Sequence, residues 1–151
     1  MIIGLLQRKG GGRSSLGQLC YHRATLAEGP CLPMDIVYLR DLRVDALIGV
    51  WAWERRIRQT LIMDIDLGTD CSRAGASDDI ADTVDYKAVT DRIMAATRAS
   101  EFKLIEALAE HLAQTVLTEF DVRWIRININ KQGVLRDVRD VGIIIERGAR
   151  A

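Results

Sequence analysis

The chain of 151 residues carries 21 basic and 21 acidic side chains, and 48% of its residues are hydrophobic, enough apolar sequence for one globular domain with a substantial core. Its zero net charge is spread evenly along the chain, which argues against a nucleic-acid or membrane-surface partner, because both attract basic tracts. The longest apolar runs are far shorter than a membrane span, and three cysteines without metal or redox spacing favour a cytoplasmic protein.

Residues 1–33 lack sustained periodicity and contain a Gly- and Ser-rich stretch at residues 10–15, which is typical of a disordered segment. The opening apolar run is too short for a secretory signal peptide, and the basic residues lie on its wrong side. We therefore expect residues 1–33 to be a disordered extension and residues 34–151 to form the folded domain. One interpretation takes Met34 as the start used in the cell.

The first patterned segment, DIVYLRDLRVDALIGV (35–50), alternates apolar and polar residues, which predicts a strand with one buried face. A break in the alternation at residues 39–41 indicates a β-bulge, and Gly49 is expected to end the strand. After a loop with two tryptophans, residues 59–70 (QTLIMDIDLGTD) alternate again. The two strands are therefore predicted to pair antiparallel across a loop too long for a tight turn.

An acidic segment then crosses to two consecutive helical patterns. Apolar residues recur at three- and four-residue spacing in residues 86–96 and again in residues 104–116, as they do on one face of a helix. Asp82, Thr83 and Asp85 are all candidate N-caps for the first helix. The sequence therefore predicts a helical hairpin.

Residues 124–130 (WIRININ) alternate again, and residues 141–147 (VGIIIER) supply a fourth strand that ends at Gly148. The order strand, strand, helix, helix, strand, strand predicts an α+β fold, a four-stranded, mostly antiparallel sheet with two helices on one face. An open sheet leaves unpaired backbone groups along both edges, so we expect several copies to close into a barrel. The chain is therefore predicted to be a homo-oligomer.

Polar residues at the ends of these elements offer acid–base chemistry. The chain has two histidines, and it has no phosphate-binding glycine loop, nucleophile elbow or zinc-protease motif, so a histidine-based metal site or catalytic triad has little material. The remaining candidates are Glu54, Tyr86, Glu106 and Lys131. Each also has a structural explanation. Glu54 can pair with one of three nearby arginines, and Lys131 can be a solvated strand-end lysine. Tyr86 can be a rim aromatic, and Glu106 can interact with a helix dipole.

Five stretches of the patterned region occur in the order and at the spacing of one family: IGVWAWE (48–54), DTVDY (82–86), LIEALAE (104–110), INKQG (129–133) and VGIIIERG (141–148). Through them the chain resembles the dihydroneopterin aldolases, folate-biosynthesis enzymes of the tunnelling fold, which also includes pterin epimerases. The resemblance implies a cytoplasmic lyase that needs no metal and no cofactor. It would cleave 7,8-dihydroneopterin in a retro-aldol step to 6-hydroxymethyl-7,8-dihydropterin and glycolaldehyde. It would also be a homo-oligomer, a tetramer or an octamer, with active sites between subunits.

In the reaction that the resemblance implies, the C6=N5 imine of the pterin accepts the electrons of the broken bond, so the enzyme only needs to move protons. Lys131 would be the general acid and base, acting directly or through a bound water. Glu54 would orient that water and the diol of the substrate. Tyr86, from a neighbouring subunit, would close the pocket and assist protonation of the intermediate.

The same resemblance implies a set of residues that bind the pterin. Glu106 would accept hydrogen bonds from the 2-amino and N3–H groups, and backbone groups of Ile105 and Val84 would hold the polar edge of the ring. One departure is Gln132, which stands where many bacterial members have proline after the lysine. It leaves a dihydroneopterin triphosphate 2′-epimerase of the same family as one alternative. A non-catalytic α+β binding or assembly module is the other.

Overall fold

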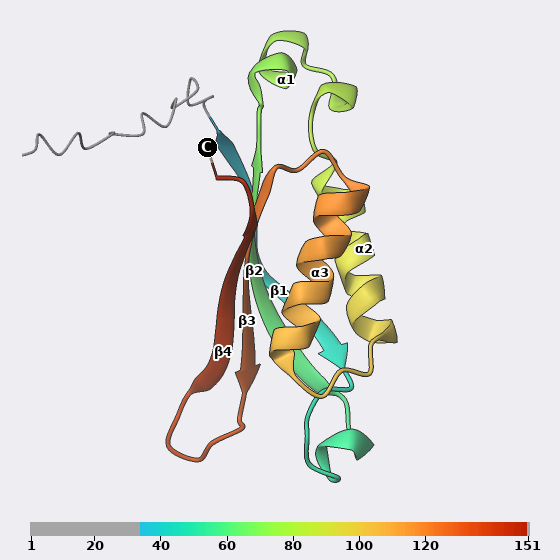
Figure 1. The fold of residues 1–151 in the computed structure, drawn as a ribbon, viewed down its shortest axis with the longest axis vertical. Helices are drawn as coiled ribbons and strands as arrows, with labels where there is room; N and C mark the ends of the chain where they lie inside the picture. The colour runs from blue at the N-terminus through green and yellow to red at the C-terminus, as the bar shows by residue number, and fades with distance from the viewer. Residues whose placement is uncertain (1–33, 151) are drawn as a thin grey trace, which may run out of the picture. The chain divides into compact units, whose positions relative to one another are not determined.

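The computed structural model describes residues 34–150 and shows four antiparallel strands with two helices on one face of the sheet (Figure 1). In order across the sheet, the strands are β1 (Asp35–Ala46), β2 (Gln59–Thr69), β3 (Trp124–Gln132) and β4 (Asp140–Gly148). The two helices are α2 (Tyr86–Ala99) and α3 (Ile105–Glu119). The predicted order of elements and the antiparallel pairing are confirmed. The prediction of a disordered extension concerns residues outside the described part of the chain.

β1 carries the predicted bulge. Its pairing with β2 shifts register between Leu39 and Leu42, and Asp41 within the bulge has a φ of 55°. The strand ends at Ala46, three residues before the glycine expected to end it. The reason is that β2 begins at Gln59, directly opposite Ala46, so the ladder has no partner beyond that point.

The core lies between the sheet and the helices. Alternate residues of β2 and β3 and one stripe of each helix are fully buried there: Leu61, Met63, Ile65, Leu67, Ile125, Ile127, Ile129, Val89, Ile93, Leu108, Leu112 and Val116. Burial of each such side chain stabilises the fold by about 1.5–3 kcal/mol before the cost of ordering it. The two periods read from the sequence therefore correspond to the two sides of one apolar layer.

Of the three candidate caps, only Asp85 caps α2. Its carboxylate accepts the backbone N–H of Lys87 at 2.9 Å and that of Ala88 at 3.0 Å. Before it, the acidic crossover contains a short helix α1 (Ser72–Ser77) and a 3₁₀ turn η2 (Ile80–Asp82), neither of which was predicted. No residue of either element is buried, so the sequence holds no apolar stripe that could reveal them.

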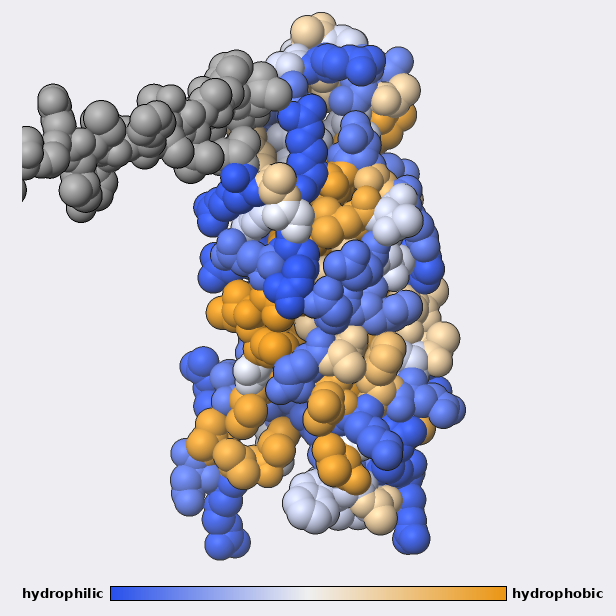
Figure 2. All heavy atoms as spheres, viewed as in Figure 1, coloured by the Kyte–Doolittle hydropathy of each residue, from blue (hydrophilic) through white to orange (hydrophobic). Residues whose placement is uncertain are grey.

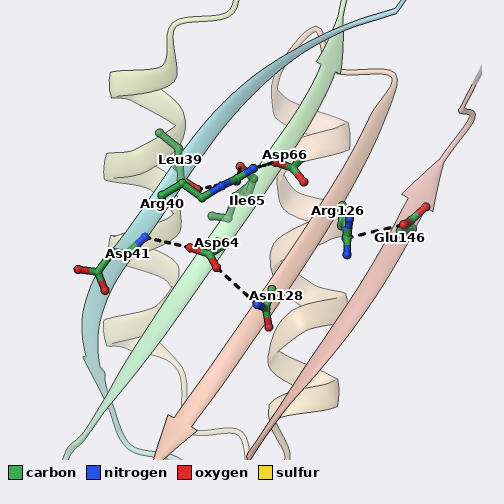
Figure 3. Close-up of polar contacts among 9 residues, drawn as sticks. All are labelled: Leu39, Arg40, Asp41, Asp64, Ile65, Asp66, Arg126, Asn128 and Glu146. Atoms are coloured by element: carbon green, nitrogen blue, oxygen red, sulfur yellow. Dashed lines mark hydrogen bonds and ion pairs between the residues drawn. The ribbon is translucent and has the colours of Figure 1, made fainter. Parts of the chain in front are cut away.

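The face of the sheet opposite the helices carries polar contacts (Figure 3). On it, Arg40 Nη2 lies 2.5 Å from the Asp66 carboxylate, and Arg126 Nε lies 3.8 Å from that of Glu146. The backbone N–H of Asp41 donates to Asp64 Oδ1 at 3.0 Å. Such contacts occur on all four strands, and they lie among exposed apolar side chains of the same face, including Ile36, Tyr38 and Ile144. Among the described residues, no helix is long and apolar enough to cross a membrane.

Candidate functional site

A buried ion pair joins the loop after β1 to the end of β3. Lys131 Nζ lies 2.5 Å from Glu54 Oε1, and the two side chains are only 9% and 4% exposed. Lysine and glutamate are seldom buried this deeply, because removing each charge from water costs several kcal/mol. The other oxygen, Glu54 Oε2, accepts the backbone N–H of Trp51 at 3.0 Å. Two buried charged side chains in contact with each other mark a candidate functional site.

Lys131 is buried because it continues an apolar row. Residues two apart on a strand share a face, so Ile125, Ile127, Ile129 and Lys131 all point toward the helices. β3 extends to Gln132, which places Lys131 inside the sheet, opposite Leu61 of β2. A solvated lysine at the end of a strand is therefore the wrong explanation.

Glu54 belongs to a short 3₁₀ helix, η1 (Glu54–Arg56), within the same loop. Burial raises the pKa of this carboxyl group, but hydrogen bonds from Lys131 and the Trp51 backbone, together with the charge of Lys131, outweigh burial, and the pKa lies below its ordinary value. Glu54 is thus a carboxylate at neutral pH. The alternative that Glu54 pairs with a neighbouring arginine is wrong, since its ionic partner is Lys131.

The absence of a side chain at Gly49 leaves the space that the Glu54 carboxylate occupies. The φ of Gly49 is 139°, and a Cβ atom at this position would lie 2.4 Å from the carboxylate carbon of Glu54. Only glycine adopts this backbone conformation without strain and also leaves room for the carboxylate. The sequence pattern identified Gly49 as a strand end and did not reveal this role. The only feature of the sequence that could have suggested this role is the position of the glycine, five residues before the candidate glutamate.

A hollow of about 310 Å³ opens beside the ion pair, at the low end of the range usual for small-molecule sites. Its walls are the loop from Ile48 to Glu54, residues 103–106 at the start of α3, and part of the β3–β4 hairpin, including Val134 and Leu135. Figure 2 shows hydrophobic side chains gathered at the end of the molecule that holds this hairpin and this loop. The hollow thus combines apolar lining residues with four charged ones, Glu54, Lys103, Glu106 and Lys131.

Glu106 and Ile105 line this hollow together with the ion pair. Glu106 is exposed, and within residues 34–150 its carboxylate makes no hydrogen bond, so both oxygens are open to a ligand. Ile105 is the first residue of α3, where backbone N–H groups have no acceptor within the helix. Four of the six predicted site residues therefore converge on one hollow. Among the described residues, no group of three or more His, Cys, Asp or Glu side chains could hold a metal ion.

The other two predicted residues lie elsewhere. Tyr86 is the first residue of α2, and from there the helix runs toward the end of the molecule that holds the β3–β4 hairpin (Figure 1). The 14 residues of this helix span roughly 21 Å. Tyr86 is 57% exposed, and Val84 lines a separate hollow with Asp70 and Arg123. A single chain does not bring Tyr86 or Val84 to Lys131.

The walls of the hollow include side chains that the sequence pattern did not single out. Trp51 and Trp53 are 67% and 57% exposed although they are large and apolar. The two tryptophans are evident in the sequence, but only the structure shows that they stay exposed beside the hollow, as is typical of side chains that contact a ligand or another protein chain. Val134 and Leu135 carry no comparable signal, because they follow a glycine turn in a polar loop.

The chain matches the family model FolB, dihydroneopterin aldolase, over residues 37–146. The dihydroneopterin aldolase of Escherichia coli (strain K12) is 38% identical over 115 residues, which are 76% of this chain and 94% of that protein. The dihydroneopterin aldolase of Haemophilus influenzae is 32% identical over 115 residues, which are 76% of this chain and 98% of that protein.

The fold agrees with these sequence matches. The crystal structure of the E. coli dihydroneopterin aldolase in complex with neopterin has a TM-score of 0.74 and 38% identity, and the match covers 76% of this chain and all of that one. The family model spans most of the chain, and the curated relatives are matched over nearly their whole length. The chain belongs to the dihydroneopterin aldolase family.

Proposed function

We propose that this chain cleaves 7,8-dihydroneopterin by a retro-aldol reaction, giving 6-hydroxymethyl-7,8-dihydropterin and glycolaldehyde for folate biosynthesis. Membership of the family supports the reaction. The observation that carries the choice of residues is the buried pair of Lys131 and Glu54, 2.5 Å apart at the base of a hollow that Glu106 also lines. A structural module would not require two desolvated charges beside an open hollow.

In the proposed reaction, the bond between C1′ and C2′ of the substrate side chain breaks. The hydroxyl on C2′ loses its proton and becomes the aldehyde of glycolaldehyde, while the bonding electrons move through C1′ and C6 to N5. Protonation at N5 and then at C1′, with loss of the N5 proton, yields the hydroxymethyl product. Cleavage of the carbon–carbon bond and formation of the product each require a proton transfer at a stated atom, which one positioned acid–base group can serve.

Lys131 is the group we assign to these transfers: as the free amine it accepts the proton of the C2′ hydroxyl, directly or through a bound water, and as the resulting ammonium it delivers a proton to N5 or C1′. Its ammonium group has three N–H donors, and the bond to Glu54 uses one of them, so the others can face the hollow. Glu54, ionised and fixed by the Trp51 N–H, orients the amine and any water beside it. The pair therefore provides a proton carrier with a defined direction.

We assign pterin binding to Glu106 and to the backbone of Ile105. The 2-amino and N3–H groups of a pterin are two adjacent donors, and a carboxylate offers two adjacent acceptors, so the pairing is a two-point contact. The free oxygens of Glu106 and the open N–H groups at the start of α3 support this assignment. The apolar walls of the hollow would cover the ring faces.

We further propose that a second copy of the chain completes each site. Tyr86 and Val84 lie at the far end of the helix pair from Lys131, so a neighbouring copy must supply them if they act at this site. The outer edges of β1 and β4 have no partner within the four-stranded sheet. Pairing of these edges between copies would close a barrel, as a tetramer or an octamer.

The direct test is to incubate the purified protein with 7,8-dihydroneopterin in EDTA and to separate the products by chromatography, with Lys131→Ala in parallel. The proposal predicts 6-hydroxymethyl-7,8-dihydropterin from the wild type, and none above background from the variant. Formation of the 2′-epimer alone would identify an epimerase instead. No product from the wild type would contradict the proposed activity.

A further inference from the structure

One arginine connects the two segments that carry the proposed site. Nη1 of Arg55 donates to the backbone carbonyl oxygens of Glu101 at 3.1 Å and Phe102 at 3.3 Å, and it lies 3.4 Å from that of Leu47. Arg55 directly follows Glu54 in η1, and Phe102 lies four residues before Glu106. The guanidinium group therefore spans from the loop that holds the ion pair to the connection that leads into α3.

These contacts do not form an ordinary surface ion pair. Within residues 34–150, Arg55 has no carboxylate within 4.0 Å, although Glu54 is its neighbour in sequence and Glu101 is one of its contacts. Its three acceptors are main-chain carbonyls: that of Leu47 lies eight positions away, and those of Glu101 and Phe102 lie 46 and 47 positions away. All three contacts come from Nη1, so one end of the guanidinium group joins the two segments; a lysine has a shorter reach and a different geometry at this position.

We infer that Arg55 is a positioning residue that sets the distance across the hollow between the Glu54–Lys131 pair and Glu106. A ring bound by Glu106 is useful only if its side chain reaches Lys131, and misplacement by about 1 Å can lower a rate 100-fold. Arg55 lines none of the hollow, so it acts through the two segments it joins. This inference rests on the proposed roles of Lys131, Glu54 and Glu106.

Arg58 offers a matched control. It lies in the same loop, and its Nη1 donates to the carbonyl oxygens of Asp45 and Arg98, each at 3.4 Å. It thus joins β1 to the end of α2 through backbone acceptors, but it reaches neither η1 nor the segment that leads into α3. Arg58→Ala removes the same charge and the same type of contact without touching the connection between the two halves of the site.

The kinetic test compares Arg55→Ala, Arg55→Lys and Arg58→Ala, with kcat measured on 7,8-dihydroneopterin and the Kd measured for neopterin, which has the same side chain and the same pterin ring edge as the substrate. We expect Arg55→Ala to lower kcat about 10- to 100-fold while the Kd for neopterin changes less than about threefold. Arg58→Ala is expected to stay within about twofold of the wild type in both, and Arg55→Lys to recover part of the rate. Equal losses in Arg55→Ala and Arg58→Ala would overturn the inference.

A second readout does not depend on catalysis. Hydrogen exchange of the full chain, followed by mass spectrometry, should show faster exchange in both residues 47–56 and residues 101–106 of Arg55→Ala, and unchanged exchange in residues 101–106 of Arg58→Ala. Unchanged exchange at residues 101–106 in Arg55→Ala would refute the connection whatever the activity. An inactive wild type with the expected exchange pattern would instead reject the proposed function and leave the connection in place.

Discussion

Replacing Lys131 by methionine should destabilise the fold strongly, because it leaves the Glu54 carboxylate buried without its partner. Glu54 is 4% exposed in the pair, and removal of one member of a buried pair typically costs about 3–5 kcal/mol. The Trp51 N–H remains as a donor to the carboxylate, so we expect a loss near the lower end, about 3 kcal/mol at pH 7. Urea unfolding at a fixed protein concentration measures it, since the stability of an oligomer varies with concentration.

The loss of stability in Lys131→Met should depend on pH in a defined direction. In the wild type the pKa of Glu54 is lowered from 4.5, so its contribution to stability is present above 4.5 and is lost as the pH falls through the folded-state pKa. Without Lys131, burial dominates and raises the pKa of Glu54, so the carboxyl group takes up a proton at a higher pH and the penalty disappears. The gap in stability between wild type and variant should therefore narrow as the pH falls from 7 toward 5.

The double variant Lys131→Met/Glu54→Gln provides the control. Removing the stranded charge should restore most of the lost stability at pH 7 and abolish the narrowing of the gap. If Lys131→Met costs less than about 1 kcal/mol, or if its deficit does not change between pH 7 and pH 5, the buried pair is not the interaction described above.

Three further outcomes follow. Gly49→Ala should lower both kcat and the thermal midpoint, because the new Cβ occupies the place of the Glu54 carboxylate and the backbone at this position is strained for any residue but glycine. An unchanged kcat and midpoint would show that the loop accommodates the methyl group. Glu106→Ala should weaken neopterin binding at least tenfold with a smaller change in kcat, whereas Lys131→Ala should mainly lower kcat. Binding is measured by titration and kcat by steady-state kinetics, and the same pattern of losses in both variants would count against the assigned roles. Asp85→Ala should lower the free energy of unfolding by about 0.5–2 kcal/mol in urea through loss of the α2 cap, and no change would show that the cap is not needed.

The fold could be predicted from the sequence because its periodicity maps onto one apolar layer. The row Ile125, Ile127, Ile129 shows the buried face of β3, and one further step of the same period reaches Lys131, so the alternation alone indicates that this lysine points into the core. The pattern does not indicate its partner. Glu54 lies 77 residues away in a loop without periodicity, and only the three-dimensional path of that loop brings it to the lysine.

Other features of the structure could not be predicted from the sequence for related reasons. α1 buries no residue, so its formation depends on local hydrogen bonding that leaves no apolar pattern. The contacts of Arg55 could not be predicted because its acceptors are backbone carbonyls, which any residue carries. An arginine next to a glutamate in the sequence suggests an ion pair between the two. The helical pattern places Tyr86 at the start of α2, but no pattern within one chain shows whether a second copy brings Tyr86 and Val84 to Lys131, as we propose.

Lys131 differs from the other candidate residues in being carried by the interior of the sheet. It is flanked by Leu61 on β2 and Val141 on β4, whereas Glu54 belongs to a loop and Glu106 to the start of a helix. Loops and helix ends open locally at a small free-energy cost, but central strands open only when the whole domain unfolds. We therefore expect the backbone of the proposed proton carrier to stay in place while the loop and the helix start beside it open locally, so that a ligand enters by moving these segments and not the strand.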